Sequence, residues 1–231
     1  MSMKAMILAA GRGKRLSPLT DTCPKPLLSI GTDTLISRQI KQLKRAGIEE
    51  IIINHAWLGN KIETELGDGS DFGVRIYYSA EGNLGLETAG GIAHALPLLG
   101  KEPFLVVNGD LFVEFDFREA FSVSVQLKHQ KSLAHLWLVP NPPHHPQGDY
   151  SITTEGYLTQ KKVQSYTFSG IGVYQPKLFG SLPFGKPYKL ASLFNQHLPQ
   201  GQLMARIFHG VWMDVGSLDR LQKVRRILQA S

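Results

Sequence analysis

The first half of the chain alternates short apolar runs with segments whose apolar residues recur at helical spacing. Runs of strand type cover residues 4–10, 50–54, 73–79 and 103–108, and helical patterns cover residues 34–46, 58–66 and 88–96. Gly47 follows the first of these helices and is a typical helix-ending residue. Because strands that alternate with helices are joined by crossovers, this order predicts a parallel sheet flanked by helices.

The second half of the chain follows a less regular order. Helices are predicted over residues 117–129, 188–198 and 217–229, and strands over 133–139, 150–153, 157–163, 166–174 and 203–208. Residues 140–149 contain four prolines and are predicted to form a shaped loop. We therefore expect an α/β fold with a Rossmann-like, mixed and mainly parallel central sheet flanked by helices.

Composition excludes several classes of protein. The chain has 231 residues, of which 42% are hydrophobic and 19% charged, as in an ordinary globular domain. No stretch approaches the roughly 20 apolar residues of a membrane helix, and the N-terminal residues do not have the pattern of a signal peptide. Cys23 is the only cysteine, which excludes an internal disulfide and favours a cytoplasmic location.

The net charge of +6 indicates an anionic partner. Nucleic-acid binding favours a basic stripe with interleaved aromatic residues, whereas these cations are mostly spread along the chain. We therefore predict small phosphates as partners, with no nucleic acid and no membrane, and make no prediction about oligomeric state.

A glycine-rich turn follows the first predicted strand. Gly11 and Gly13 allow close approach of a ligand to the backbone, and their N–H groups suit an oxyanion. Cations surround the turn, at Arg12, Lys14, Arg15 and, between two prolines, Lys25. The sequence lacks the third glycine of a Rossmann fingerprint and the Ser or Thr that follows the lysine of a Walker loop. A phosphate-binding turn of another kind is predicted.

The segment LAAGRGKRLSPLTDTCPKPLL resembles the signature of sugar-1-phosphate nucleotidyltransferases, and ETAGG (87–91), NGD (108–110) and WMDVG (212–216) extend the resemblance over nearly the whole chain. It implies the nucleotide-diphospho-sugar transferase fold and one catalytic domain over 1–231. Residues 1–115 would form its nucleotide-binding half and residues 116–231 its sugar-binding half. In this reaction a sugar-1-phosphate oxygen attacks the α-phosphorus of a nucleoside triphosphate, so charge neutralisation matters more than a side-chain nucleophile.

The resemblance also implies roles for single residues. Arg15 and Lys25 would be catalytic, Asp110 and Asp214 would bind Mg²⁺, and nucleotide contacts would come from Ala10, Gly11, Arg12, Gly13, Lys25, Gly90, Gly91 and Asn108. Asn108, Asp149 and Glu87 would bind the sugar substrate, although Glu87 could instead cap a helix and the Arg12 side chain could be solvated. Trp57, Trp137 and Trp212 are expected to pack in the core or at its rim.

Three further segments, at 53–59, 138–150 and 167–174, resemble family members that transfer UMP from UTP to N-acetylmuramate α-1-phosphate in peptidoglycan recycling. Guanylyl transfer to mannose- or heptose-1-phosphate, and cytidylyl transfer to a phospho-alcohol, remain alternatives with the same chemistry. A catalytically silent nucleotide-sugar sensor is a third possibility. His144 and His145 have either a structural role in their loop or a role near the sugar.

Overall fold

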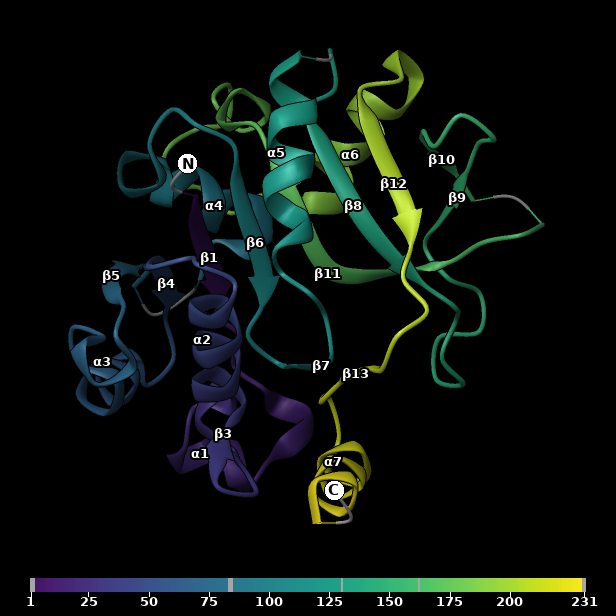
Figure 1. The fold of residues 1–231 in the computed structure, drawn as a ribbon. Helices are drawn as coiled ribbons and strands as arrows, with labels where there is room; N and C mark the ends of the chain where they lie inside the picture. Colours follow the sequence, from purple (N-terminus) through teal and green to yellow (C-terminus); the bar gives the residue numbers. More distant parts are fainter. Residues whose placement is uncertain (1–2, 83–84, 130, 162, 230–231) are drawn as a thin grey trace. The chain divides into compact units, whose positions relative to one another are not determined.

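The computed structural model describes residues 3–82, 85–129, 131–161 and 163–229 (Figure 1). These residues form two compact units, each built from separate stretches of chain. Unit 1 contains residues 1–85, 107–117 and 211–231, and unit 2 contains residues 86–106 and 118–210. The division into halves at residue 115 stays a prediction.

Unit 1 is built on parallel strands. Its strand order is β6-β1-β4-β5, where β6 (Phe104–Asn108) belongs to this unit only from Val107 onward. The strands β1 (Lys4–Leu8), β4 (Glu50–His55) and β5 (Arg75–Ala80) run parallel. Its helices are α1 (Leu19–Thr22), α2 (Leu35–Arg45), α3 (Gly59–Leu66) and α7 (Leu218–Gln229). Two short antiparallel pairs complete it, β2 (Ser29–Ile30) with β3 (Asp33–Thr34), and β7 (Leu111–Val113) with β13 (Trp212–Asp214).

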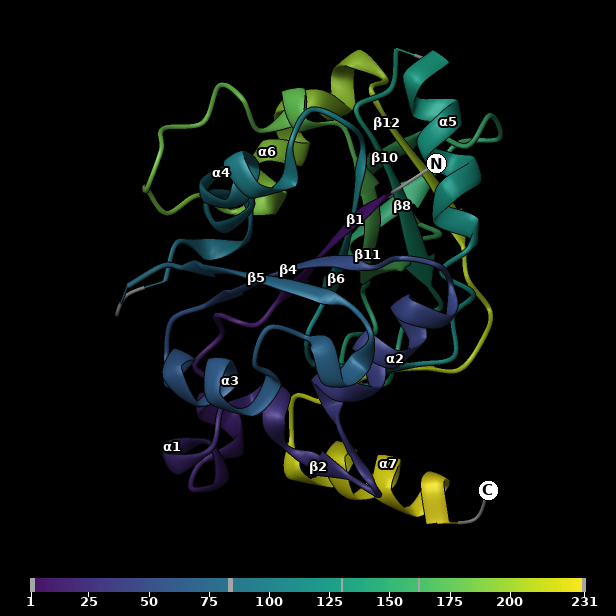
Figure 2. The same cartoon turned by 60° about the vertical axis from the view of Figure 1, so that its left-hand side comes forward.

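Local signals explain the main elements of unit 1. The Ile51, Ile52 and Ile53 side chains of β4 are fully buried, as in a central parallel strand. A capping box between Thr34 and Ser37 starts α2. The C-terminal helix α7 lies beside β2, where the Arg225 Nε–H donates to the carbonyl of Ser29 over 3.0 Å (Figure 2).

Unit 2 contains strands in the order β12-β8-β11-β6. The strand β8 (Ala134–Val139) is buried along its whole length, with β11 (Thr167–Tyr174) antiparallel on one side and β12 (Leu203–Ile207) parallel on the other. The β6 strand (Phe104–Asn108) is divided between the two units. A small hairpin joins β9 (Tyr150–Ile152) to β10 (Leu158–Gln160). The helices are α4 (Glu87–Leu99), α5 (Glu119–His129), which packs on β8, and α6 (Leu190–His197).

The predicted fold class is confirmed, since the sheet is mixed and mainly parallel and helices flank it. Every long predicted helix and strand is present, with ends shifted by a few residues. The predicted strand over 157–163 is shorter, at Leu158–Gln160, and its residue 162 lies outside the described residues. The pairs β2–β3 and β7–β13 and five 3₁₀ turns (Lys14–Leu16, Lys25–Leu27, Ser70–Phe72, Pro176–Leu178 and Leu198–Gln200) were not predicted.

Within the described ranges, no helix combines the length and the apolar character that crossing a bilayer requires.

Candidate active site

The glycine-rich turn folds back on the chain that follows it. Gly13 has a φ of +68°, and a Cβ atom there would lie 3.1 Å from Thr20 Cγ2 and 3.2 Å from Lys25 Cβ. The Thr20 hydroxyl donates to the Gly13 carbonyl over 2.9 Å. Gly13 is therefore required by both its backbone conformation and its packing. A Cβ atom at Gly11 would meet nothing within 4 Å, so the packing of the described residues does not explain that glycine.

The NGD turn is pressed against the end of β1. The Gly109 N–H donates to the Leu8 carbonyl over 2.8 Å, and a Cβ atom at Gly109 would lie only 2.6 Å from that oxygen. On the preceding residue, the Asn108 carbonyl accepts a 2.8 Å hydrogen bond from Gln39 of α2. These contacts fix the turn that carries Asp110 at the carboxyl end of β1, where ligands bind in sheets of this type.

Lys25 and Asp110 form an ion pair through Lys25 Nζ and Asp110 Oδ2. The lysine side chain is 12% exposed and the aspartate side chain 29%, so the pair is partly shielded from water. Lys25 comes from the 3₁₀ turn Lys25–Leu27 between two prolines, which holds its backbone rigid. A lysine and an aspartate far apart in sequence are thereby placed together in unit 1.

Pairing of β7 with β13 brings Asp214 beside the NGD turn. Asp214 pairs with Leu111, the neighbour of Asp110, and the Val215 N–H donates to the Asp110 carbonyl over 2.8 Å. The two aspartates that were predicted to bind magnesium therefore lie on adjacent stretches of backbone. Carboxylate oxygens are ligands that Mg²⁺ prefers, usually one or two together with substrate phosphates and water.

Arg220 is a site residue that the sequence did not predict. Its Nη1 donates to Asp214 Oδ1 over 3.1 Å, and its side chain is 14% exposed. A Cβ atom at Gly216 would lie 3.1 Å from Arg15 Nη2 and 3.2 Å from Asp214 Oδ2, and still closer to Arg220 Nη2. Arg15, Asp214 and Arg220 therefore converge around Gly216. No sequence signal indicates Arg220, because the turn at 215–217 decides where α7 points its first residues.

The predicted contacts Glu87, Gly90, Gly91 and Asp149 lie in unit 2. Glu87 begins α4 with a φ of +57°, which is rare for a residue with a long side chain. Gly91 is buried in the same helix. The N–H of Gly90 donates to the Tyr188 carbonyl over 3.1 Å, and a Cβ atom at Gly90 would lie 2.4 Å from the Lys186 carbonyl. Packing within unit 2 thus requires Gly90, and the predicted nucleotide contacts of Gly90 and Gly91 stay predictions.

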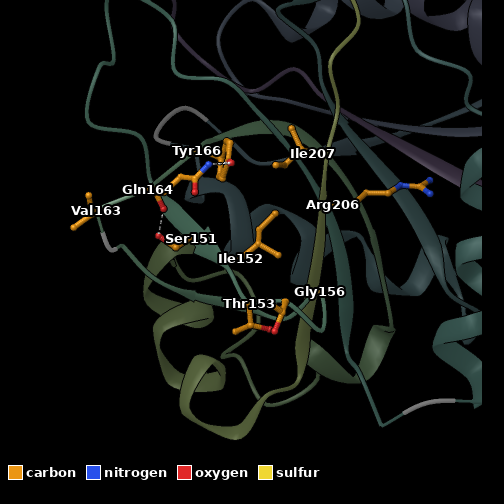
Figure 3. A pocket seen from close by; sticks show the side chains of 10 residues that line it. Ser151, Ile152, Thr153, Gly156, Val163, Gln164, Tyr166, Arg206 and Ile207 are labelled. Carbon is orange, nitrogen blue, oxygen red and sulfur yellow. Dashed lines mark hydrogen bonds between the residues drawn. The ribbon is translucent and has the colours of Figure 1, made fainter.

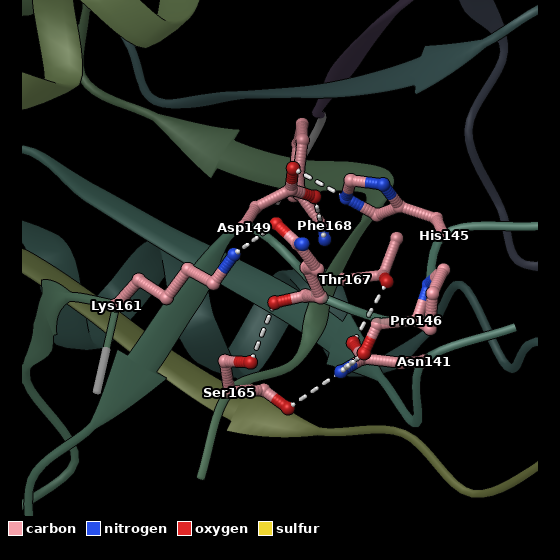
Figure 4. Close-up of polar contacts among 9 residues, drawn as sticks. Asn141, His145, Pro146, Asp149, Lys161, Ser165, Thr167 and Phe168 are labelled. Carbon is pink, nitrogen blue, oxygen red and sulfur yellow. Dashed lines mark hydrogen bonds and ion pairs between the residues drawn. The ribbon is translucent and has the colours of Figure 1, made fainter. Parts of the chain in front are cut away.

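Asp149 joins two parts of unit 2 (Figure 4). Its Oδ2 accepts a hydrogen bond from the Phe168 N–H over 2.8 Å, and its Oδ1 lies 2.9 Å from His145 Nε2. The Asn141 amide nitrogen donates to the carbonyls of Pro146 and Ser165, over 3.2 and 3.0 Å. His145 therefore has a structural contact in its loop. The predicted sugar contact of Asp149 stays a prediction.

A pocket of about 670 Å³ opens between the β9–β10 hairpin and β12 (Figure 3). Several of its polar groups already bond to one another. The Ser151 hydroxyl donates to the Gln164 carbonyl over 2.6 Å, and Gln164 Nε2 donates to the Tyr166 hydroxyl over 2.6 Å. The Arg206 side chain points away from the hollow, toward Glu119. None of the predicted site residues lines this pocket.

Comparison with known proteins agrees with these observations. The chain is 50% identical over 230 residues to the N-acetylmuramate alpha-1-phosphate uridylyltransferase of Neisseria meningitidis serogroup B, covering 99% of both proteins. It is 29% identical to the enzyme of that name from Caulobacter vibrioides, covering 92% of this chain and 91% of that one.

A solved structure resembles the chain over its whole length. A protein of Bacillus anthracis, provisionally named a glucose-1-phosphate thymidylyltransferase, is 25% identical and superposes with a TM-score of 0.85 over 100% of this chain and 96% of that one. The family model for nucleotidyl transferases matches residues 4–231. The chain belongs to the nucleotidyl transferase family.

Proposed function

We propose that the protein transfers UMP from UTP to N-acetylmuramate α-1-phosphate and releases pyrophosphate and UDP-N-acetylmuramate. The observation that carries the proposal is the 50% identity to the Neisseria meningitidis uridylyltransferase over 99% of both chains. This product would return a cell-wall sugar to nucleotide-activated form, so we expect a role in peptidoglycan recycling in the cytoplasm.

The chemistry fits the charges in unit 1. An oxygen of the sugar phosphate attacks the α-phosphorus of UTP, a new P–O bond forms, and the bond to the β-phosphate oxygen breaks. Both reactants are anions, so the protein must offset their repulsion and hold them in line. Lys25 and Arg15, from residues 1–85, and Arg220, from residues 211–231, supply positive charge in unit 1. The sugar phosphate is already ionised, and no general base is needed.

Magnesium belongs to the same proposal. Asp110 and Asp214 would hold the ion, because their backbones are adjacent and carboxylates suit a hard cation. The described residues contain no cluster of three or more His, Cys, Asp or Glu side chains that could hold a metal, so the triphosphate and water would complete the coordination. When bound, the ion would neutralise charge on the triphosphate.

A substrate matrix tests the proposal. The purified protein is incubated with UTP, GTP or CTP and with N-acetylmuramate, N-acetylglucosamine, glucose or mannose α-1-phosphate, and pyrophosphate release and product mass are measured. We expect the highest kcat/KM for UTP with N-acetylmuramate α-1-phosphate. N-acetylglucosamine α-1-phosphate is the matched control, since it lacks only the lactyl ether. If no combination of nucleotide and sugar phosphate released pyrophosphate, the enzymatic proposal would be refuted. A preference for GTP with mannose α-1-phosphate would favour the guanylyl alternative.

A further inference from the structure

The side chain of Arg12 is held by the protein. Its guanidinium carbon lies 3.6 Å from the centroid of the Trp57 ring. Nη1 donates to the Thr20 carbonyl over 2.9 Å, and Nη2 lies 3.3 Å from Asp21 Oδ1. The side chain is 32% exposed, so the stack is partly shielded from water. Stacking of a guanidinium on a tryptophan face is the strongest common form of cation–π contact.

Trp57 is itself fixed in place. Its Nε1–H donates over 3.0 Å to the Thr20 carbonyl, the same oxygen that accepts from Arg12. Lys61 of α3 also donates to the Thr22 carbonyl over 2.6 Å, and α3 lies beside α1 (Figure 2). The segment from Trp57 to Lys61 is therefore hydrogen-bonded to α1, which follows the glycine-rich turn.

Thr20 of α1 connects Trp57 to the glycine-rich turn. The residue is fully buried, and its hydroxyl donates to the Gly13 carbonyl while its own carbonyl accepts from Arg12 and Trp57. Both the residue before Gly13 and Gly13 itself are thus tied to Thr20. A turn with two glycines loses much conformational freedom when it is ordered, and these ties order it before a ligand arrives.

We propose that Trp57 is a positioning residue for nucleotide binding, which acts through the Arg12 side chain to keep residues 11–15 in their binding shape. This role does not require contact between Trp57 and the nucleotide, because Trp57 acts through Arg12, which lies over one face of its ring. Arg12 would then serve the nucleotide through the backbone of the turn. The identity of UTP as the nucleotide rests on the proposed function.

This role has a kinetic signature. If residues 11–15 are already ordered before the nucleotide binds, the entropic cost of ordering them is removed equally for the bound ground state and for the transition state. Loss of the stack should therefore raise the Kd and the KM for UTP and leave kcat nearly unchanged. A purely structural role would lower the melting temperature without changing the Kd of the folded protein.

A double-mutant cycle tests the proposal on the full chain, with Trp57→Leu, Arg12→Gln, the double variant and the wild type. The Kd for UTP is measured by titration calorimetry, and kcat and KM by pyrophosphate release. We expect each single substitution to raise the Kd about three- to fivefold, the range of a partly exposed cation–π contact, and the double variant to be no weaker than the worse single variant. Trp57→Phe retains a ring face and should be affected less than Trp57→Leu.

The outcomes separate the two proposals. A wild-type Kd in folded Trp57→Leu, or single effects that multiply in the double variant, would overturn the role of Trp57. If the wild type binds UTP but releases no pyrophosphate with any sugar phosphate, the proposed function fails. The double-mutant cycle, measured through the Kd for UTP, still decides the role of Trp57 in that case.

Discussion

Lys25 is the residue on which the proposed chemistry depends most. Its ammonium already faces Asp110, at the end of β1 and the NGD turn. Loss of one preorganised donor to developing charge typically lowers turnover by about 10²-fold or more. We predict that Lys25→Ala lowers kcat by at least that factor while circular dichroism shows an intact fold. Lys41→Ala, which removes an exposed lysine of α2, is the control and should retain turnover. Near-normal turnover in Lys25→Ala would remove this residue from the mechanism.

Arg220 makes a different contribution, since it holds Asp214 rather than facing Asp110. Hydrogen bonds to charged groups are worth about 1.5–3 kcal/mol when shielded from water, and this pair is partly exposed. We predict that Arg220→Met lowers kcat/KM about tenfold, the lower end of that range. Arg226→Met, an exposed change on the same helix, should have no effect. Equal kcat/KM values for the two variants would show that Asp214 does not need this partner.

At the scale of elements, the long helices and strands could be predicted because each has its own periodic signal. The helical spacing of the apolar residues in α2 and the apolar run of β4 are examples. The pair β7–β13 could not, because its strands have three residues each and are too short for a period. That pair nevertheless sets the positions of Asp110 and Asp214. Resemblance indicated which aspartates matter, whereas their placement and the partner Arg220 depend on tertiary pairing.

The strand β8 carries a titratable group that the chemistry does not use. Burial, with a smaller effect from Arg206, lowers the pKa of His135 to about 4. Between pH 6.5 and 4 the unfolded chain binds a proton at His135 that the folded chain does not bind. The contribution of His135 to the free energy of unfolding is therefore fully present above pH 6.5 and falls as the pH drops toward 4. We predict that, from pH 6.5 to 4, the free energy of unfolding falls by about 3 kcal/mol more in the wild type than in His135→Gln. Urea denaturation at a series of pH values measures this difference. His129→Gln, at an exposed position, is the control. Parallel pH profiles for wild type and His135→Gln would contradict the assignment.

At the scale of the molecule, the chain passes repeatedly between the two units. The core of unit 1 shows the consequence, because it takes residues from each of its three stretches of chain. The members of this core are Leu16, Leu28, Ile30, Leu35, Phe112, Val215, Leu221 and Val224. Neither unit is a continuous piece of sequence, so we expect unfolding to be cooperative. The aspartates of the candidate site lie beside Phe112 and Val215 of this core and depend on it.

Leu221 on α7 tests this cooperativity. The side chain is fully buried in the unit 1 core, and Leu→Ala at such positions costs about 2–5 kcal/mol. We predict that Leu221→Ala lowers the melting temperature by roughly 5–15 °C in a single calorimetric transition, since 1 kcal/mol corresponds to about 2–4 °C at this chain length. Leu218→Ala on the same helix, 47% exposed, is the matched control and should melt within about 1 °C of the wild type. If α7 only frayed in Leu221→Ala, the main transition would stay where it is and only the early loss of helix signal would grow. That result would show that the three stretches of unit 1 do not fold as one body.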